Sequence, residues 1–187
     1  GRGDDTLLGG AGNDILYGDF KAGSGSGNGS HGSHGSHGSH ASASGSGGDG
    51  TFNDYLDGGA GDDLLYAGIG DDTANYTVGE NLDASDFYDG GSGVDRLEIR
   101  FTQQEWLDLN PGLQDNLDAY IDFLAAHINP ATGEADDAVF QFNVFDLSAS
   151  RFEDFAVFVD GVEVDAADNR VIANDDAVGL NSDASST

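Results

Sequence analysis

Glycine and aspartate recur together at a fixed spacing in the first half of the chain. The nine-residue pattern Gly-Gly-x-Gly-x-Asp-x-U-x, in which U is a large apolar residue, is complete at residues 9–17, 58–66 and 90–98. Incomplete copies in the same pattern occupy residues 1–8, 49–57 and 67–75. Calcium takes about six to eight oxygen ligands and accepts carboxylate and carbonyl oxygens together. The repeated aspartates therefore predict calcium sites.

The remaining residues of the pattern must position those oxygens. Glycine at the first, second and fourth positions permits positive φ, so that the backbone can turn tightly with its carbonyl groups inward. The last three residues predict a short strand whose apolar eighth residue points inward. Two such units would make one turn of a parallel β-roll, with each calcium ion between stacked turns on the same side.

These residues resemble the hemolysin-type calcium-binding repeats of the RTX (repeats-in-toxin) family, over about residues 1–19 and 49–98. The resemblance implies a right-handed parallel β-roll, type I secretion, and folding outside the cell on meeting calcium. It implies the fold class as well: a mainly β protein with an α+β cap, in which two helices and a few antiparallel strands close the roll.

The resemblance also implies the calcium ligands. The aspartates at the sixth position are Asp5, Asp14, Asp54, Asp63, Asp72 and Asp95, and the residues before them, as second side-chain ligands, are Asp4, Asn13, Asp62 and Asp71. Carbonyl ligands would come from Gly1, Gly3, Gly10, Gly12, Gly59, Gly61, Gly68, Gly70, Gly91 and Gly93. Residues 76–89 break the nine-residue spacing, and the irregular ligands predicted there are Asp89 and, beside it, Glu80, Asn81 and Asp83.

The composition of the chain excludes or disfavours several classes of function. The chain has 35 acidic and 6 basic residues among 187, a formal net charge of −29. Such a charge excludes ordinary nucleic-acid binding, which needs a basic face, and disfavours docking on an anionic membrane. Cysteine is absent, so the chain has no disulfide and no thiol chemistry. A compact protein this acidic repels itself unless cations intervene.

Residues 20–48 interrupt the repeats without shifting their register. Within it, residues 22–48 are rich in Gly, Ser and His and have no side chains that could build a core, so a flexible insertion is predicted. His31, His34, His37 and His40 could form a weak transition-metal tract, but a natural or engineered spacer is the simpler interpretation. Because the pattern resumes in register with Gly58, Asp5 should lie near Asp54, and Asp14 near Asp63. The interruption suggests a split domain whose natural loop carries another domain.

From Arg96 onward the periodicity changes. Alternating apolar residues predict strands at 97–101, 140–144 and 155–159, and Asp160-Gly161 predicts a hairpin turn into 162–164. Thr102 and Glu105 form a capping-box pattern that starts a helix at Gln103. An apolar stripe predicts a second helix over 113–128. We interpret residues 99–172 as a cap on the end of the roll, in one domain spanning 1–172, and 173–187 as a linker to a following module.

Three functions fit these features. The first is a calcium-binding structural module of a secreted, cell-surface adhesin that positions a ligand-binding domain; neighbouring modules are then the partners. The second is a calcium-dependent peptide- or sugar-binding domain, and the third is the secretion and folding tail of an RTX enzyme. No catalytic motif is present, and His127, near the end of the second helix, is interpreted as structural, so the chain itself is predicted to be a monomeric non-enzyme.

Overall fold

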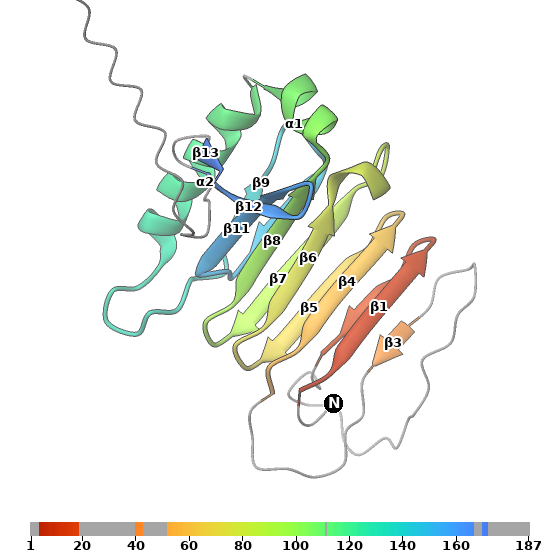
Figure 1. Ribbon diagram of the computed structural model, residues 1–187. Helices are drawn as coiled ribbons and strands as arrows, with labels where there is room; N and C mark the ends of the chain where they lie inside the picture. The colour runs from red at the N-terminus through yellow and green to blue at the C-terminus, as the bar shows by residue number, and fades with distance from the viewer. Residues whose placement is uncertain (1–3, 19–39, 43–51, 111, 167–169, 172–187) are drawn as a thin grey trace, which may run out of the picture.

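The computed structural model describes residues 4–18, 40–42, 52–110, 112–166 and 170–171. Two β-sheets and two helices make up this part of the chain (Figure 1). The mainly β class, the parallel strands and the two helices agree with the prediction from sequence.

Outside the insertion, the strands of residues 6–101 enter the two sheets alternately. The first sheet has the order β1 (Thr6–Ala11), β4 (Tyr55–Ala60), β6 (Thr73–Thr77), β8 (Arg96–Phe101), β11 (Asp154–Val159), β12 (Val162–Asp165) and β13 (Arg170–Val171). The second has the order β3 (His40–Ser42), β2 (Ile15–Tyr17), β5 (Leu64–Ile69), β7 (Asp86–Ser92), β10 (Leu147–Ser150) and β9 (Val139–Gln141). The chain therefore winds as a coil in which each turn gives one strand to each sheet.

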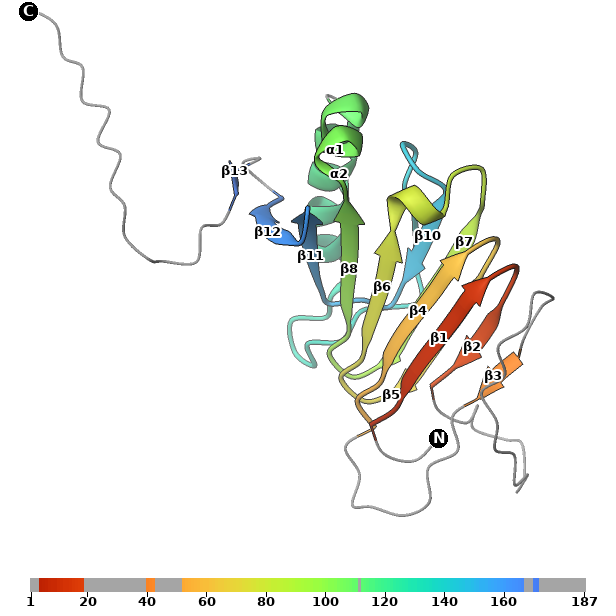
Figure 2. The ribbon, with the colours of Figure 1, turned by 45° about the vertical axis from the view of Figure 1, so that its right-hand side comes forward.

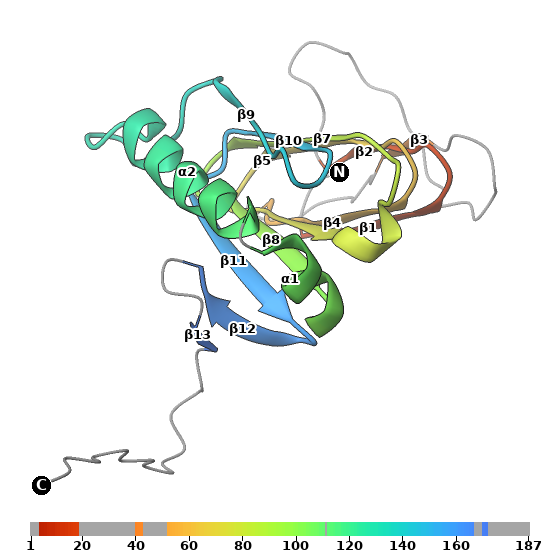
Figure 3. The ribbon, with the colours of Figure 1, turned by 90° about the horizontal axis from the view of Figure 1, so that it is seen from above.

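The coil stacks through parallel pairing. β1, β4, β6, β8 and β11 pair in parallel in the first sheet, as do β2, β5, β7 and β10 in the second (Figure 2). The apolar eighth residue of each repeat points between the sheets, where Leu16, Leu56, Leu65 and Leu97 are at most 1% exposed. Figure 3 shows the sheets edge-on as two layers, with α2 (Gly112–His127) across the end farthest from β1.

The coil extends beyond the segment that the repeats predict. β10 pairs with β7, and β11 pairs with β8 over residues 96–101, so residues expected only as a cap add another turn to both sheets. α1 (Gln103–Leu109), α2 and β9 lie within the long connection between β8 and β10. The nine-residue pattern could not predict this turn, because its strands have the right alternation but lack the glycines.

The helices follow the sequence closely. Thr102 accepts the backbone N–H of Glu105, and the Glu105 carboxylate accepts that of Thr102, so the predicted capping box forms and α1 starts at Gln103. α2 buries Tyr120, whose ring centroid lies 4.9 Å from that of Phe142 and 5.1 Å from that of Phe155. The predicted strand at 140–144 is shorter than expected, because the Phe142 N–H bonds to the Leu147 carbonyl and closes a turn.

The insertion differs from the prediction at one place. His40–Ser42 forms β3 and pairs in parallel with β2, although the composition predicted a coil there. Backbone pairing needs no particular side chains, so a Gly/Ser-rich segment can add to the edge that β2 presents. The other residues of the insertion, including His31, His34 and His37, lie outside the described residues.

Candidate metal centre

Aspartates line up along one edge of the coil, where the chain crosses from the first sheet to the second. The Asp14 backbone N–H donates to Oδ1 of Asp63 (2.7 Å), and the Asp63 N–H donates to Oδ1 of Asp86 (2.8 Å). Each of these residues begins or immediately precedes a strand of the second sheet, so the strand register stacks them. We call Asp14, Asp63 and Asp86 the first ladder.

A second ladder lies at the opposite crossing. The N–H of Asp5 donates to Oδ1 of Asp54 (2.8 Å), that of Asp54 to Asp72 (2.6 Å), and that of Asp72 to Asp95 (2.8 Å). The Asp95 N–H donates to Oε2 of Glu153 (2.6 Å), which ends this series. Asp5 thus neighbours Asp54, and Asp14 neighbours Asp63, as the register of the interrupted repeats predicts.

Three carboxylates of the ladders, those of Asp63, Asp86 and Asp95, are buried and use only part of their hydrogen-bonding capacity. Asp63, Asp86 and Asp95 are 0%, 3% and 0% exposed. In each, Oδ1 accepts a backbone N–H, whereas Oδ2 is buried without a hydrogen-bond partner. A buried carboxylate oxygen without a partner is costly unless a cation or proton neutralises it. The ladders therefore offer anionic oxygens for a hard cation.

Burial changes the acidity of these groups. Desolvation, followed by repulsion from nearby carboxylates, raises the pKa of Asp63 to about 7 and that of Asp86 to about 7. The same causes raise the pKa of Asp95 to about 8, with Asp72 and Glu153 among the repelling carboxylates. Ionised together, these aspartates need a counter-charge between the turns.

The glycines divide into two roles. Those at the second and fourth positions have positive φ, between 86° at Gly59 and 137° at Gly93, as predicted; the set is Gly10, Gly12, Gly59, Gly61, Gly68, Gly70, Gly91 and Gly93. The prediction of positive φ was wrong for the first position, where Gly9, Gly58 and Gly90 do not have positive φ. There the constraint is space, since a Cβ at Gly9 would lie 2.2 Å from the Gly58 carbonyl oxygen. Gly1 and Gly3 lie outside the described residues.

The residues before the ladder aspartates form an exposed outer row. The Asp62 N–H donates to Oδ1 of Asn13 (3.1 Å), and the Asn13 side-chain amide donates to Asp62 (3.2 Å). Likewise, the Asn53 N–H donates to Asp4 (3.1 Å), and the Asp71 N–H donates to Oδ1 of Asn53 (3.0 Å). The structure thus gives Asp4, Asn13, Asp62 and Asp71 hydrogen bonds that link adjacent turns; their role as calcium ligands stays a prediction.

Two acidic residues in the irregular segment differ from expectation. Asp89, predicted as an irregular ligand, accepts hydrogen bonds at both carboxylate oxygens from the guanidinium of Arg151, so an ion pair occupies it. Asp86, which the sequence did not single out, occupies the ladder position instead. It lies 23 residues after Asp63, as Asp95 does after Asp72, but no Gly-Gly-x-Gly sequence precedes it, so the nine-residue pattern could not identify it. The one feature of the repeats that Asp86 keeps is a large residue two positions later, Tyr88, and this order could have indicated it.

No three carboxylate, imidazole or thiol side chains converge on one point within the part of the chain that the structure describes. A cation between two turns would therefore take some of its oxygens from the backbone. The tight turns, which bring carbonyl oxygens of neighbouring glycines close to the ladder carboxylates, supply such oxygens. This mixture of carboxylate and carbonyl oxygens suits calcium.

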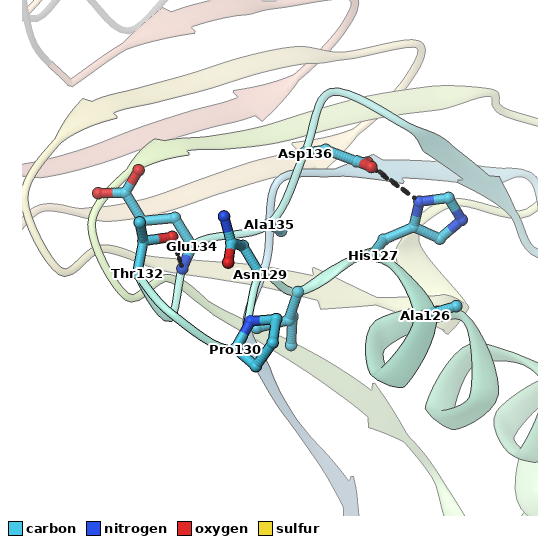
Figure 4. A pocket seen from close by; sticks show the side chains of 9 residues that line it. Ala126, His127, Asn129, Pro130, Thr132, Glu134, Ala135 and Asp136 are labelled. Atoms are coloured by element: carbon cyan, nitrogen blue, oxygen red, sulfur yellow. Dashed lines mark hydrogen bonds and ion pairs between the residues drawn. The ribbon is translucent and has the colours of Figure 1, made fainter.

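A separate hollow lies at the end of α2, lined by residues 126–136 (Figure 4). Nδ1 of His127 lies 3.1 Å from the Asp136 carboxylate oxygens, and this contact lowers the pKa of Asp136. The pair ties the helix end to the following loop, where the Asp136 N–H also bonds to the His127 carbonyl. The geometry is that of a structural helix terminus.

Buried aspartates repeated at successive turns, with glycines closing the regular turns, are typical of a coil built from calcium-binding repeats. Residues 1–20 and 45–75 match the family model of the RTX calcium-binding nonapeptide repeat, in four copies. The chain therefore carries RTX calcium-binding repeats. No curated protein and no solved structure matched the chain. Neither described helix is long and apolar enough to cross a membrane.

Proposed function

We propose that this chain is a calcium-binding structural module whose coil is the calcium-loaded β-roll of the RTX repeats. The ladder aspartates Asp5, Asp14, Asp54, Asp63, Asp72 and Asp95 would hold the ions between adjacent turns, with carbonyl oxygens of the turn glycines. The single observation that carries the proposal is the buried, unpartnered Oδ2 at Asp63, Asp86 and Asp95. Bound calcium would supply the positive charge that these oxygens lack.

Calcium binding would then be coupled to folding. The sites exist only when turns stack, so the free energy of binding becomes free energy of folding. We expect weak sites, with dissociation constants on the order of 10⁻⁴ to 10⁻³ M, as in extracellular modules. Such sites fill outside the cell, which supports a secreted, cell-surface location.

Equilibrium dialysis against radioactive calcium tests the proposal. The chain should bind several calcium ions with sub-millimolar to millimolar affinity, and an excess of magnesium should displace them poorly, because magnesium needs a smaller octahedral site and loses its water reluctantly. Failure to bind calcium at millimolar concentration, or equal displacement by magnesium, contradicts it.

We further propose that the module acts without catalysis as a rigid spacer of a secreted adhesin that positions a ligand-binding domain. Support comes from the continuous parallel sheets and from residues 173–176, which are similar to the start of a following module. Single-molecule stretching, with the chain placed between reference domains, tests this role. Calcium should raise the unfolding force several-fold, and an unfolding force that calcium leaves unchanged would contradict the spacer role.

A further inference from the structure

The third turn of the coil crosses between the sheets by an irregular path. β6 is followed by a 3-10 turn at Val78–Glu80 and a loop that ends at Asp86, with none of the Gly-Gly-x-Gly sequence of the regular turns. The strand register is nevertheless kept, because Leu64 and Leu65 pair with Phe87 and Tyr88. Tyr88 therefore occupies the inward position that leucine holds at Leu16 and Leu65.

The first glycine of each repeat marks where two oxygens of adjacent turns converge. A Cβ at Gly90 would lie 2.8 Å from Oδ2 of Asp95 and 2.2 Å from the Arg151 carbonyl oxygen. Gly9 and Gly18 have the same combination of one carboxylate oxygen and one carbonyl oxygen from the next turn. Each such position thus lies beside a mixed pair of oxygen atoms.

At Gly58 the second oxygen comes from a side chain. A Cβ there would lie 2.6 Å from Oδ2 of Asp63 and 2.8 Å from the hydroxyl oxygen of Tyr88, with no carbonyl among its nearest atoms. The three atoms nearest to this place thus include no carbonyl oxygen of the irregular third turn. The longer side chain at Tyr88 brings an oxygen there instead.

The Tyr88 hydroxyl is an unpartnered polar group aimed into this gap. Tyr88 is 0% exposed, and its hydroxyl has no hydrogen-bond partner. Burial, then the Asp86 carboxylate and then the Asp63 carboxylate, raise the pKa of Tyr88 well above its usual range, as expected of a neutral hydroxyl beside two acids. Tyr76, whose ring centroid lies 5.9 Å from that of Tyr88, adds a second buried hydroxyl without a hydrogen-bond partner.

We propose that Asp63, Asp86 and Tyr88 form a calcium site that the nonapeptide pattern does not assign, in which the Tyr88 hydroxyl replaces the carbonyl oxygen of a regular turn. The inference rests on the proposed calcium function. It extends the first ladder through a turn that lacks the repeat sequence, so calcium binding continues where the pattern stops.

Calcium binding to Tyr88→Phe tests the site, because this change removes one oxygen atom and keeps the ring that fills the core. Tyr66→Phe is the matched control: it loses the same atom from a half-buried ring on the outer face, stacked on Tyr17 at 5.2 Å. Equilibrium dialysis with calcium should show one site about fivefold to tenfold weaker in Tyr88→Phe, the effect of losing one polar contact. The other sites should keep their affinity, and Tyr66→Phe should match the wild type.

Asp86→Asn gives an independent readout. The number of calcium ions bound per chain should fall by one, whereas Asp122→Asn, which removes the same charge from an exposed residue of α2, should keep the wild-type number. Wild-type stoichiometry and affinities in both Tyr88→Phe and Asp86→Asn overturn this site alone. A wild-type chain that binds no calcium overturns the proposed function with it.

Discussion

In Asp63, Asp86 and Asp95, the two carboxylate oxygens have separate functions. Oδ1 of Asp63 holds the backbone of the neighbouring turn, while Oδ2 lies buried and available to a cation. The hydrogen bonds set the spacing of the turns, and that spacing fixes where the cation must bind. A substitution that keeps one function and removes the other can separate them.

Asp63→Asn makes this separation. The amide oxygen can still accept the Asp14 N–H, but the anionic oxygen is lost. The calcium concentration at the folding midpoint should therefore rise about tenfold, equivalent to about 1.4 kcal/mol. Circular dichroism during a calcium titration measures the midpoint. Asp122→Asn, on the exposed face of α2, is the control and should leave it unchanged; an equal shift in both variants would indicate only an effect of net charge.

The raised acidities predict how the calcium-free chain responds to pH. The pKa values of Asp63 and Asp86 rise from 3.8 to about 7, and that of Asp95 to about 8. The folded, calcium-free chain therefore binds more protons than the unfolded chain between these values. The stabilisation that these protons give is present in full at a pH below the pKa of the aspartates in the unfolded chain. It is lost as the pH rises through their pKa in the folded chain.

The thermal midpoint measured in a calcium chelator should accordingly decrease as the pH is raised from about 5 to about 8. Saturating calcium should reduce or reverse that fall, because calcium binds the ionised carboxylates. A midpoint in chelator that rises with pH over this range would show that the ladder carboxylates are not buried as described.

At the scale of elements, the helices pack on the coil and are connected to its strands at both ends. α1 begins two residues after β8, and the Trp106 ring meets the Phe101 ring of β8 edge to face, with centroids 5.5 Å apart. β10 and β11 continue both sheets after the helices. The helices should therefore fold together with the coil.

Trp106 fluorescence reports this coupling. Trp106 is only 7% exposed and packs against Phe101 of the coil, so its environment should change when the coil folds. Its emission should therefore shift at the same calcium concentration as the far-ultraviolet circular dichroism signal of the strands. Two well-separated midpoints would show that the helical segment folds independently of the coil.

Local signals in the sequence predicted the elements that have strong local determinants. The capping box at Thr102 set the start of α1, and the Asp160-Gly161 turn set the hairpin between β11 and β12. The pairing of β11 with β8 depends on contacts between residues 58 positions apart, and the chain between them carries two helices. Alternation alone could show that 154–159 is a strand but could not show its partner.

The candidate site was predictable to the extent that it repeats. Asp63 and Asp95 follow the pattern, and the structure places both in ladders. Asp86 could not be found, because the irregular loop before it changes the spacing while the strand register stays the same. Asp89 was predicted as a ligand because it lies in the acidic segment that breaks the spacing, but the Arg151 that binds it is 62 residues away.

At the scale of the whole molecule, the insertion tests whether the coil closes across a break. β1 pairs with β4, and β2 pairs with β5, although residues 20–48 intervene. Replacing that segment with about eight Gly and Ser residues should change the free energy of unfolding by about 1 kcal/mol or less, because closure entropy depends weakly on loop length and offsets the loss of β3. Chemical denaturation in saturating calcium measures it, and a loss of several kcal/mol would show that the insertion itself stabilises the fold.

A net charge of −29 and two rows of buried aspartates make calcium-dependent folding the central claim. Circular dichroism of the full chain in excess chelator, followed by addition of calcium or magnesium, tests it most directly. At pH 8, where Asp63 and Asp86 have lost the protons that stabilise the calcium-free chain, we expect an unfolded spectrum in chelator. Added calcium at sub-millimolar to millimolar concentration should give a cooperative gain of strand signal, with magnesium largely ineffective. A native-like spectrum and an unchanged thermal midpoint in chelator would contradict the account.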